Sequence, residues 1–303
     1  MLHQLDIYGK DKVDLAIDTL RFFEPKDGSG YYLAFSGGKD SVCLKALADM
    51  AGVKYDAHYS VSSVDPPELV RFIKQYHPDV KFEHTYNKQG KPNTMWSLIA
   101  ERTMPPLRTA RYCCKYLKES AGNGRVTATG VRWAESVNRM KNQGRVTIMQ
   151  KGMEQNENFS KTARGGVVLR EDKAQIFLNN DNDESREVMD FCIKQRKTVV
   201  NPIIDWEDDD VWEFIHENNL PYCSLYDEGF KRLGCIGCPL GGFKAQKKDF
   251  DRFPQYKKLY LMAFDRMLKT HQCRQWTTPE EVFAWWIGDK DGYNKRDDVK
   301  QNG

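Results

Sequence analysis

The stretch "SGGKDS", residues 36–41, has the residue types of a phosphate-binding loop. It follows the apolar run 31–35 and precedes a helical pattern. Two consecutive glycines let the backbone turn sharply and come close to an anion, and the first amides of a helix point at phosphate oxygens. Lys39 adds a positive charge, while Ser36 and Ser41 add hydroxyl donors. Together these residues predict a phosphate-binding loop.

The loop departs from the Walker A pattern G-x-x-x-x-G-K-[ST]. The first glycine would fall at Leu33, and Asp40 stands where Ser or Thr must follow the lysine. Two glycines before a helix can also form nothing more than a tight turn. Here Gly37 and Gly38 lie between a serine and a lysine, which favours the phosphate site over the turn.

Eight cysteines raise the question of a metal site, and four of them form two close pairs. These are Cys113-Cys114 and Cys235-x-x-Cys238. C-x-x-C alone is compatible with zinc, with an iron–sulfur cluster or with a redox dithiol. Adjacent cysteines suit structural zinc poorly, because its ligands are usually spaced C-x₂₋₄-C, whereas four thiolates also fit a [4Fe–4S] cluster.

The other cysteines have plainer interpretations. Cys43 and Cys192 lie in helical patterns, which predicts small buried side chains. Cys223 precedes the second pair closely and is expected either near the metal site or buried, outside the ligand set. No long apolar run resembles a signal peptide or a membrane span, so we expect a cytoplasmic protein without disulfides and without a membrane partner.

Strand and helix patterns alternate from residue 31 to 131, which predicts βαβ units. We therefore expect an α/β fold with a doubly wound, mostly parallel sheet. Ligands bind beyond the carboxyl ends of such strands, so Ser36, Asp65 and Gly130 should meet in one cleft. The strand patterns cover 31–35, 53–61, 80–86 and 125–131, and the helical ones 14–23, 40–52, 66–77, 94–102 and 110–120.

The rest of the chain divides into a polar middle and a helical end. Residues 139–182 are polar and basic, and they read equally as a solvated insertion or as a basic lid over an anionic substrate, with short strands at "RVTIM" and "GVVL". Amphipathic patterns at 245–271 and 279–288 predict helices. We expect a nucleotide-binding domain over 1–240, with the insertion inside it, and a helical extension over 241–303. The net charge of +3 makes no general case for nucleic acid.

"SGGKDS" after a strand resembles the signature of the PP-loop ATP pyrophosphatase superfamily. Its members typically cleave ATP between the α and β phosphates and activate a substrate as its adenylate. The resemblance implies that the amides of Gly37 and Gly38, with Ser36, Lys39 and Ser41, cradle the pyrophosphate of ATP. It also implies Mg²⁺ as a cofactor, with Asp40 either placing the metal or ordering the loop.

"TGVRWAESVNR" (129–139) resembles the G-x-R-x-x-E-S-x-x-R stretch of the phosphoadenosine phosphosulfate (PAPS) reductase family. Arg132 follows a strand end together with Gly130 and can fork onto a phosphate. Glu135 is placed to orient it, and Arg139 lies one helical turn further. The simpler interpretation is a surface helix with ion pairs. We expect Lys39, Asp40 and Arg132 to be catalytic.

The resemblance to this family extends from about residue 30 to 240. "NPIIDWEDDDVWEFI" (201–215) resembles another of its elements, for which we expect Trp206 and Trp212 in the core. In the iron–sulfur members, a Cys-Cys pair and a later C-x-x-C hold a [4Fe–4S] cluster. Cys113, Cys114, Cys235 and Cys238 match that pattern, and the resemblance thus implies this cofactor.

Sulfonucleotide reductases of the family end in a Cys-Gly-Leu-His-type tail whose cysteine attacks sulfur. The last cysteine here, Cys273 in "THQCRQW", lacks that context. We therefore expect an adenylating ATP pyrophosphatase in sulfur transfer or thio-modification of nucleic acid, similar to the enzymes of DNA phosphorothioation and to cluster-dependent tRNA thiolases.

The partners implied are an adenine nucleotide, a cysteine desulfurase or other sulfur donor, a nucleic-acid acceptor and a second copy of the chain. Two alternatives stay open. One is a PAPS or APS (adenosine phosphosulfate) reductase with Cys273 or Cys223 as nucleophile, and the other is a non-catalytic nucleotide-binding iron–sulfur module. The sequence does not choose between ATP and a sulfonucleotide, nor between DNA, RNA and a small molecule as acceptor.

Overall fold

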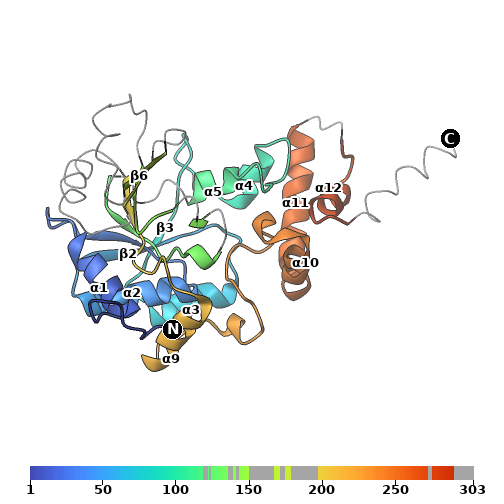
Figure 1. Ribbon diagram of the computed structural model, residues 1–303. Coiled ribbons are helices and arrows are strands. Elements are labelled where there is room, and N and C mark those ends of the chain that lie inside the picture. The colour runs from blue at the N-terminus through green and yellow to red at the C-terminus, as the bar shows by residue number, and fades with distance from the viewer. Residues whose placement is uncertain are drawn as a thin grey trace, which may run out of the picture. The chain divides into compact units, whose positions relative to one another are not determined.

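The computed structural model has an α/β architecture with a helical C-terminal region, as the sequence predicted (Figure 1). It describes residues 1–118, 122, 124–135, 139–140, 143–149, 167–170, 175–178, 197–271 and 275–289. The strands are β1 (Tyr31–Ala34), β2 (Tyr55–Ser60), β3 (Lys81–Glu83), β4 (Thr127–Ala128), β5 (Val146–Met149), β6 (Val167–Arg170), β7 (Gln175–Leu178) and β8 (Lys197–Val200). The α-helices are α1 (Lys12–Phe22), α2 (Lys39–Ala51), α3 (Pro67–Tyr76), α4 (Met95–Ala100), α5 (Tyr112–Leu117), α9 (Asp208–Glu217), α10 (Gly242–Arg252), α11 (Pro254–Thr270) and α12 (Pro279–Trp286).

One half of the sheet is parallel and reverses its winding direction next to β1. The strand order is β3-β2-β1-β4-β8-β5-β7-β6. β1 pairs in parallel with both β2 and β4, and β4 pairs in parallel with β8. The chain therefore winds outward in one direction from β1 to β3 and in the other from β4 to β8. Ligands of doubly wound sheets bind beyond the strand ends at this point of reversal, which is where the predicted phosphate loop follows β1.

The other half of the sheet is antiparallel. β5 pairs antiparallel with β8 and with β7, and β7 pairs antiparallel with β6. The strands expected at "RVTIM" and "GVVL" are therefore confirmed, and they extend the sheet rather than form a separate flap. Most of the remaining residues of the 139–182 segment lie outside the described residues.

Helix α2 begins and ends at glycines. Gly38 is its N-cap, and Gly52 closes it in the left-handed conformation at φ 68°, as C-terminal glycines commonly do. Its buried face carries Val42, Leu44 and Leu47. On this side α2 packs against α1 and α9 (Figure 1). The burial of this face holds the start of the helix, and hence the phosphate loop, at the end of β1.

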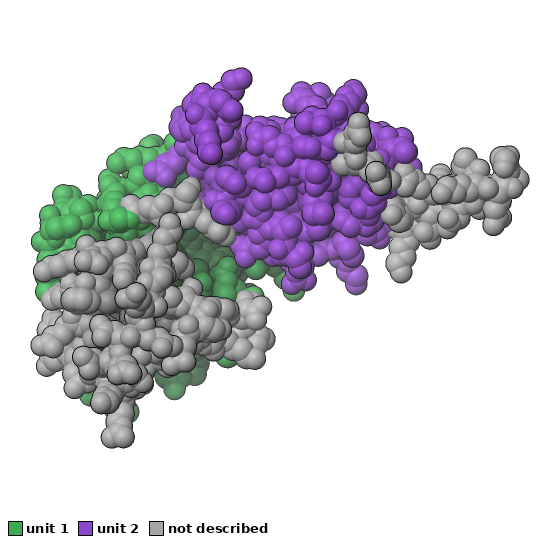
Figure 2. Space-filling view, turned by 90° about the horizontal axis from the view of Figure 1, so that it is seen from above, with its two compact units in different colours: residues 1–59, 71–82, 122–232 green, residues 60–70, 83–121, 233–303 purple. Residues whose placement is uncertain are grey.

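The chain forms two compact units, each coloured separately in Figure 2. The first comprises 1–59, 71–82 and 122–232, and contains the sheet. The second comprises 60–70, 83–121 and 233–303, so that the C-terminal helices pack with α4 rather than stand alone. Its core is an aromatic cluster in which the Trp286 ring lies 4.7 Å from Tyr260 and 5.6 Å from Phe264. The second unit combines residues from both sides of position 240, where the sequence analysis placed a domain boundary. That boundary stays a prediction.

Within the described part of the chain, no helix has the length and apolar character needed to cross a bilayer.

The glycine before β1 is required by a close backbone approach. A Cβ at Gly30 would lie 2.6 Å from the Lys54 carbonyl oxygen, whereas one at Gly28 would meet nothing within 4 Å. Both glycines have left-handed φ angles, 71° and 74°. We expect Gly28→Ala to lower the free energy of unfolding by about 1 kcal/mol through backbone strain. Gly30→Ala should cost about 1–3 kcal/mol more, because β1 must shift. Urea unfolding of the two variants measures the difference, and equal losses would contradict the close approach.

Candidate functional site

The predicted phosphate loop connects β1 to α2. Gly37 takes a left-handed φ of 73°, a conformation that favours glycine. A Cβ at Gly38 would make only ordinary contacts, at 3.4 Å from both the Ser36 Oγ and the Tyr226 hydroxyl. The turn of the chain therefore depends on Gly37, and Gly38 caps the helix.

Hydrogen bonds hold the loop in place from inside. The Ser41 hydroxyl donates to the Gly38 carbonyl over 2.8 Å, and Ser36 Oγ lies 3.3 Å from Ser41 Oγ. The Lys39 backbone N–H donates to the Tyr226 hydroxyl over 2.9 Å. The tyrosine oxygen thus occupies an amide at the start of α2 that would suit a phosphate oxygen.

Two buried cations meet two carboxylates beside this loop. Lys39 and Arg132 are 4% and 2% exposed. The Lys39 ammonium lies 2.9 Å from Asp208 Oδ1 and 3.4 Å from Asp40 Oδ1. Arg132 donates from Nε to Asp40 over 2.6 Å, from Nη2 to Asp208 over 2.5 Å and from Nη1 to the Trp206 carbonyl over 3.0 Å. Each carboxylate therefore contacts both cations.

The pairing changes the acidity of these groups. Burial tends to raise the pKa of Asp208, but the hydrogen bonds from Lys39 and Arg132 outweigh it and hold that pKa below its usual value. Burial likewise opposes the charged form of Arg132, and Asp40 and Asp208 raise the pKa of its guanidinium nonetheless. Asp208 and Arg132 are therefore both charged at neutral pH.

The residues that follow β4 also approach the first turn of α2. A Cβ on Gly130 would lie 2.8 Å from the Asp40 carbonyl oxygen, so this glycine lets β4 end directly against the first turn of α2. Glu135 accepts the backbone N–H of Arg132 over 3.3 Å and forms ion pairs with Arg139 and Arg232. It therefore contacts the backbone of Arg132, not the guanidinium that we expected it to orient.

Most of the predicted nucleotide-site residues lie together in the first unit. Asp65 differs, because it belongs to the second unit, where its carboxylate accepts both the N–H and the hydroxyl of Ser62 over 2.9 and 2.7 Å. Its role in a nucleotide pocket stays a prediction. The residues found around the loop are Ser36, Gly37, Gly38, Lys39, Asp40, Ser41, Gly130 and Arg132, with Glu135 and Arg139 one step away.

Sequence reasoning missed Asp208 and Tyr226. Three aspartates in the first turn of α9 suit the helix dipole, and one of them, Asp210, is structural: it is buried and pairs with Lys12 at 2.5 Å. Asp208 stands two residues earlier and faces the cations instead. A lysine and an arginine that are both buried require carboxylate partners. A search for such partners was the signal that could have pointed to Asp208. Trp206 is fully buried as expected, whereas Trp212 is only half-buried.

The second unit contains all four paired cysteines. Cys113 and Cys114 lie in α5, and the Cys238 N–H donates to the Cys235 carbonyl over 3.2 Å to close a turn. Gly237 in that turn has a φ of 73°, and a Cβ there would lie 2.5 Å from the Phe250 ring. All four thiols are half-buried and unbridged.

The four thiols share one electrostatic environment. A hydrogen bond from Cys113, followed by Arg111, lowers the pKa of Cys114 to about 5. Burial raises the pKa of Cys238, and the charges of Cys235 and Cys114 raise it further. Cys235 is the main cause that raises the pKa of the Lys118 ammonium, which is thus held as a cation beside the thiols. Lys118 is a further residue that the sequence reasoning did not single out.

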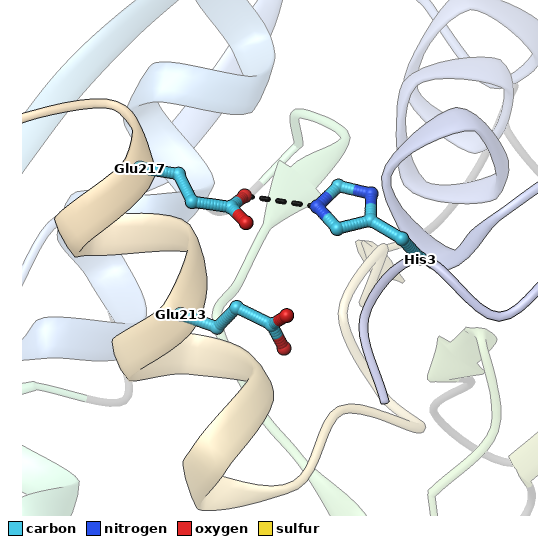
Figure 3. A group of neighbouring side chains, drawn as sticks. All are labelled: His3, Glu213 and Glu217. Carbon is cyan, nitrogen blue, oxygen red and sulfur yellow. Dashed lines mark hydrogen bonds and ion pairs between the residues drawn. The ribbon is translucent and has the colours of Figure 1, made fainter.

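Among the described residues, the four thiols are more widely spaced than the closest group of metal-ligating side chains. Of the residues that the structure describes, the group with three ligand atoms within 4.8 Å of one another is His3, Glu213 and Glu217, an exposed set that contains none of the four thiols (Figure 3). Ligands of one zinc ion lie close together, each about 2.3 Å from the metal. Thiolates of a [4Fe–4S] cluster bind separate irons and are more widely spaced.

Two cysteines outside the paired set, Cys43 and Cys223, are buried. Cys43 is fully buried, and burial raises the pKa of its thiol far above the usual value. Cys223 is 1% exposed. Both match the expectation of buried side chains, while Cys192 and Cys273 lie outside the described residues.

Comparison with known proteins identifies the family. The model of the phosphoadenosine phosphosulfate reductase domain matches residues 30–241. The chain belongs to this family. Its expected membership is therefore confirmed at the family level, over a span that includes the phosphate loop, the Arg132 stretch and all four paired cysteines.

Individual relatives match smaller parts of their own length. An adenosine 5'-phosphosulfate reductase of Oceanobacillus iheyensis is 44% identical over 64 residues, which are 20% of this chain and 27% of the reductase. An uncharacterized protein of Methanocaldococcus jannaschii is 53% identical over 281 residues, 88% of this chain and 54% of that protein. The chain thus spans about a quarter to about half of these curated relatives. The PAPS reductase of Candida auris, solved as a phosphate complex, is similar with a TM-score of 0.41 and 14% identity, over 73% of this chain and 87% of the other.

Removal of the shared carboxylate should destabilise the site in a pH-dependent way. Asp208→Asn leaves two buried cations short of one anion, so we expect a lower free energy of unfolding near pH 7. Because the native pKa of Asp208 is depressed, its contribution is complete above about pH 5 and disappears as the pH falls through that pKa. Denaturant unfolding at several pH values measures the gap between wild type and variant.

Asp209→Asn is the matched control, since Asp209 lies on the same turn, is also exposed and has no ion pair with any residue that the structure describes. A gap of the same size for both variants, or one that widens as the pH falls, would disprove the role of Asp208.

Proposed function

We propose that this chain is an adenylating ATP pyrophosphatase of the PP-loop type that carries a [4Fe–4S] cluster and acts in sulfur transfer. One observation carries the nucleotide part: two buried cations, Lys39 and Arg132, stand at the start of α2 beside a glycine turn. Buried cations of this kind suit a polyphosphate, whose charge they can neutralise in a water-poor site.

The reaction requires positions for the α-phosphate and for the leaving pyrophosphate. An acceptor oxygen attacks the α-phosphorus, the bond between that phosphorus and the bridging oxygen to the β-phosphate breaks, and pyrophosphate leaves. We assign the pyrophosphate to the loop amides and Lys39. We assign the α-phosphate to Arg132, whose guanidinium has five N–H donors. Three of them have acceptors among the described residues, so donors remain for a phosphate.

Asp40 and Asp208 keep the cations in place before the nucleotide arrives. Both accept hydrogen bonds from Arg132 and both contact Lys39. A Mg²⁺ ion bound with ATP would offset the phosphate charge, and Asp40, on the loop itself, is the carboxylate we assign to it. Tyr226 leaves the Lys39 amide when a phosphate oxygen takes that position.

The cysteine set supports the iron–sulfur part of the proposal. Four half-buried thiols from two segments of the second unit interact with one another, and Lys118 supplies a cation beside them. When bound, a [4Fe–4S] cluster supplies thiolate-ligated iron for sulfur or electron chemistry. Ser62, whose hydroxyl oxygen lies 3.3 Å from the Cys235 sulfur, and Asp65 would hold that ligand in its orientation.

A sulfonucleotide reductase is the second candidate, favoured by the similarity to adenosine 5'-phosphosulfate reductases. Reduction of a sulfonucleotide needs a thiolate that can reach the sulfur. Among the described cysteines outside the set of four, Cys43 and Cys223 are both buried. This burial disfavours Cys223 as the nucleophile, and Cys273 lies outside the described residues.

The loss of Lys39 should separate the chemistry from the cluster. Lys39→Ala removes a charge that stabilises the leaving pyrophosphate, so we expect pyrophosphate release from ATP to fall at least about 100-fold. The iron and acid-labile sulfide content should not change. Incubation with labelled ATP, and separately with labelled PAPS and APS, measures both reactions. Sulfite release without pyrophosphate release would overturn the proposal in favour of the second candidate.

The cluster itself is tested by its ligands. Anaerobic purification should yield a brown protein with about four iron and four sulfide per chain. Cys114→Ser or Cys235→Ser should lose most of both, while Cys223→Ala, at a buried cysteine outside the set, should retain them. A colourless protein with one zinc per chain would refute the cluster.

A further inference from the structure

The segment around the adjacent cysteines is strongly basic and aromatic. Residues 102–118 contain five lysines and arginines and no aspartate or glutamate. The second unit, to which this segment belongs, has more basic than acidic residues in the sequence, whereas the first unit has more acidic ones. The small net charge of the chain therefore conceals an uneven distribution.

Two of the five basic side chains contact the thiols. Arg111 hydrogen-bonds Cys114, and Lys118 hydrogen-bonds Cys235. The other three, Arg102, Arg108 and Lys115, have no such contact with a thiol among the described residues. Neutralisation of the thiolates thus explains only part of the charge.

Two of the remaining cations, Arg102 and Lys115, lie beside an exposed tyrosine. Tyr116 is 39% exposed and lies on α5, next to α4 (Figure 1). The Arg102 guanidinium is 5.2 Å from the centre of its ring and 5.5 Å from that of Tyr112, and the Lys115 ammonium is 6.0 Å from the Tyr116 ring. Arg108 and Lys115 are exposed, and neither forms an ion pair with any residue that the structure describes.

We propose that this basic aromatic surface, formed by Arg102, Arg108, Lys115 and Tyr116, binds a single-stranded nucleic acid. The inference rests on the proposed function, since it names the class of acceptor that would reach the cysteine set. Unpaired basic side chains bind the phosphate backbone, and an exposed aromatic ring flanked by cations stacks an unpaired base. An acidic protein could pair with these charges, but it has no base to stack on the Tyr116 ring.

The position of the surface fits an acceptor. Tyr116 and Lys115 follow Cys114 directly in α5, so a strand bound there would run past the metal ligands. The phosphates of the strand would meet side chains that are not engaged by the thiols. A base stacked on Tyr116 would be fixed within the same helix that carries two of the four cysteines.

The test uses the full chain and a fluorescein-labelled single-stranded 20-mer, as DNA and as RNA, with fluorescence anisotropy over a series of salt concentrations. For wild type we expect binding that weakens with salt. Arg108→Ala combined with Lys115→Ala should reduce the slope of log K against log[salt] by about 1.4, since each contact with a single strand contributes about 0.7. Tyr116→Ala should weaken binding at least about fivefold, whereas Tyr116→Phe should retain it.

The matched control removes two charges from the same unit at another place. Lys244 and Lys247 are exposed on α10, so Lys244→Ala combined with Lys247→Ala should leave the slope unchanged. An equal reduction in this control would overturn the proposed surface. So would binding of poly-L-glutamate as tight as that of the oligonucleotide, together with an unaffected Tyr116→Ala, because an acidic protein would then be the better occupant.

Pyrophosphate release, measured on the same preparations, separates this inference from the proposed function. Release without oligonucleotide binding would overturn the surface and leave the enzyme intact. Binding without release would support the surface and reject the pyrophosphatase. Thermal unfolding and iron content of each variant show whether the altered side chains have disturbed the second unit.

Discussion

The need to pair two buried cations organises the nucleotide side of this protein. Lys39 and Arg132 are almost inaccessible to solvent, and an unpaired buried charge costs several kcal/mol. The structure meets that need with Asp40 from the loop and Asp208 from the start of α9. Four segments must therefore meet at one point: the end of β1, the first turn of α2, the end of β4 and the start of α9. In the proposed function, a phosphate would enter this group of charges and exchange one set of anions for another.

The sheet brings these segments together by a simple topological rule. β1 and β4 are neighbours on either side of the reversal in strand order, so the stretches that follow them begin side by side. Gly130 then allows β4 to end against α2, because a side chain would collide with the Asp40 backbone. Residues 36–41 and 130–132, almost a hundred positions apart, thus form one surface. The antiparallel strands β5, β7 and β6 extend the other edge of the same sheet and take no part in this meeting point.

The cysteine set depends on a different kind of packing. It is built from a short helix and a turn in the second unit, whose core is the aromatic cluster around Trp286. Gly237 fits the turn against Phe250, Ser62 and Lys118 contact the Cys235 thiol, and Asp65 in turn accepts hydrogen bonds from Ser62. The polar residues of the segment 60–70 thus belong with the cysteines, although the strand that precedes them is part of the sheet. Basic charge is concentrated on the same unit, where it can serve the thiols and the anion that reaches them.

The sequence by itself determined the α/β class, the phosphate loop, the two cysteine pairs and the family, because these depend on local composition and spacing: glycines before a helix, alternating strands and helices, and paired thiols. It could not determine which distant side chains complete each site. Asp208 looked like an ordinary residue of a helix N-terminus, and nothing in the sequence singled out Tyr226 or Lys118. Only the tertiary structure decided their places, because the partners of a buried charge or a buried amide are chosen by which strand ends and helix ends meet in space.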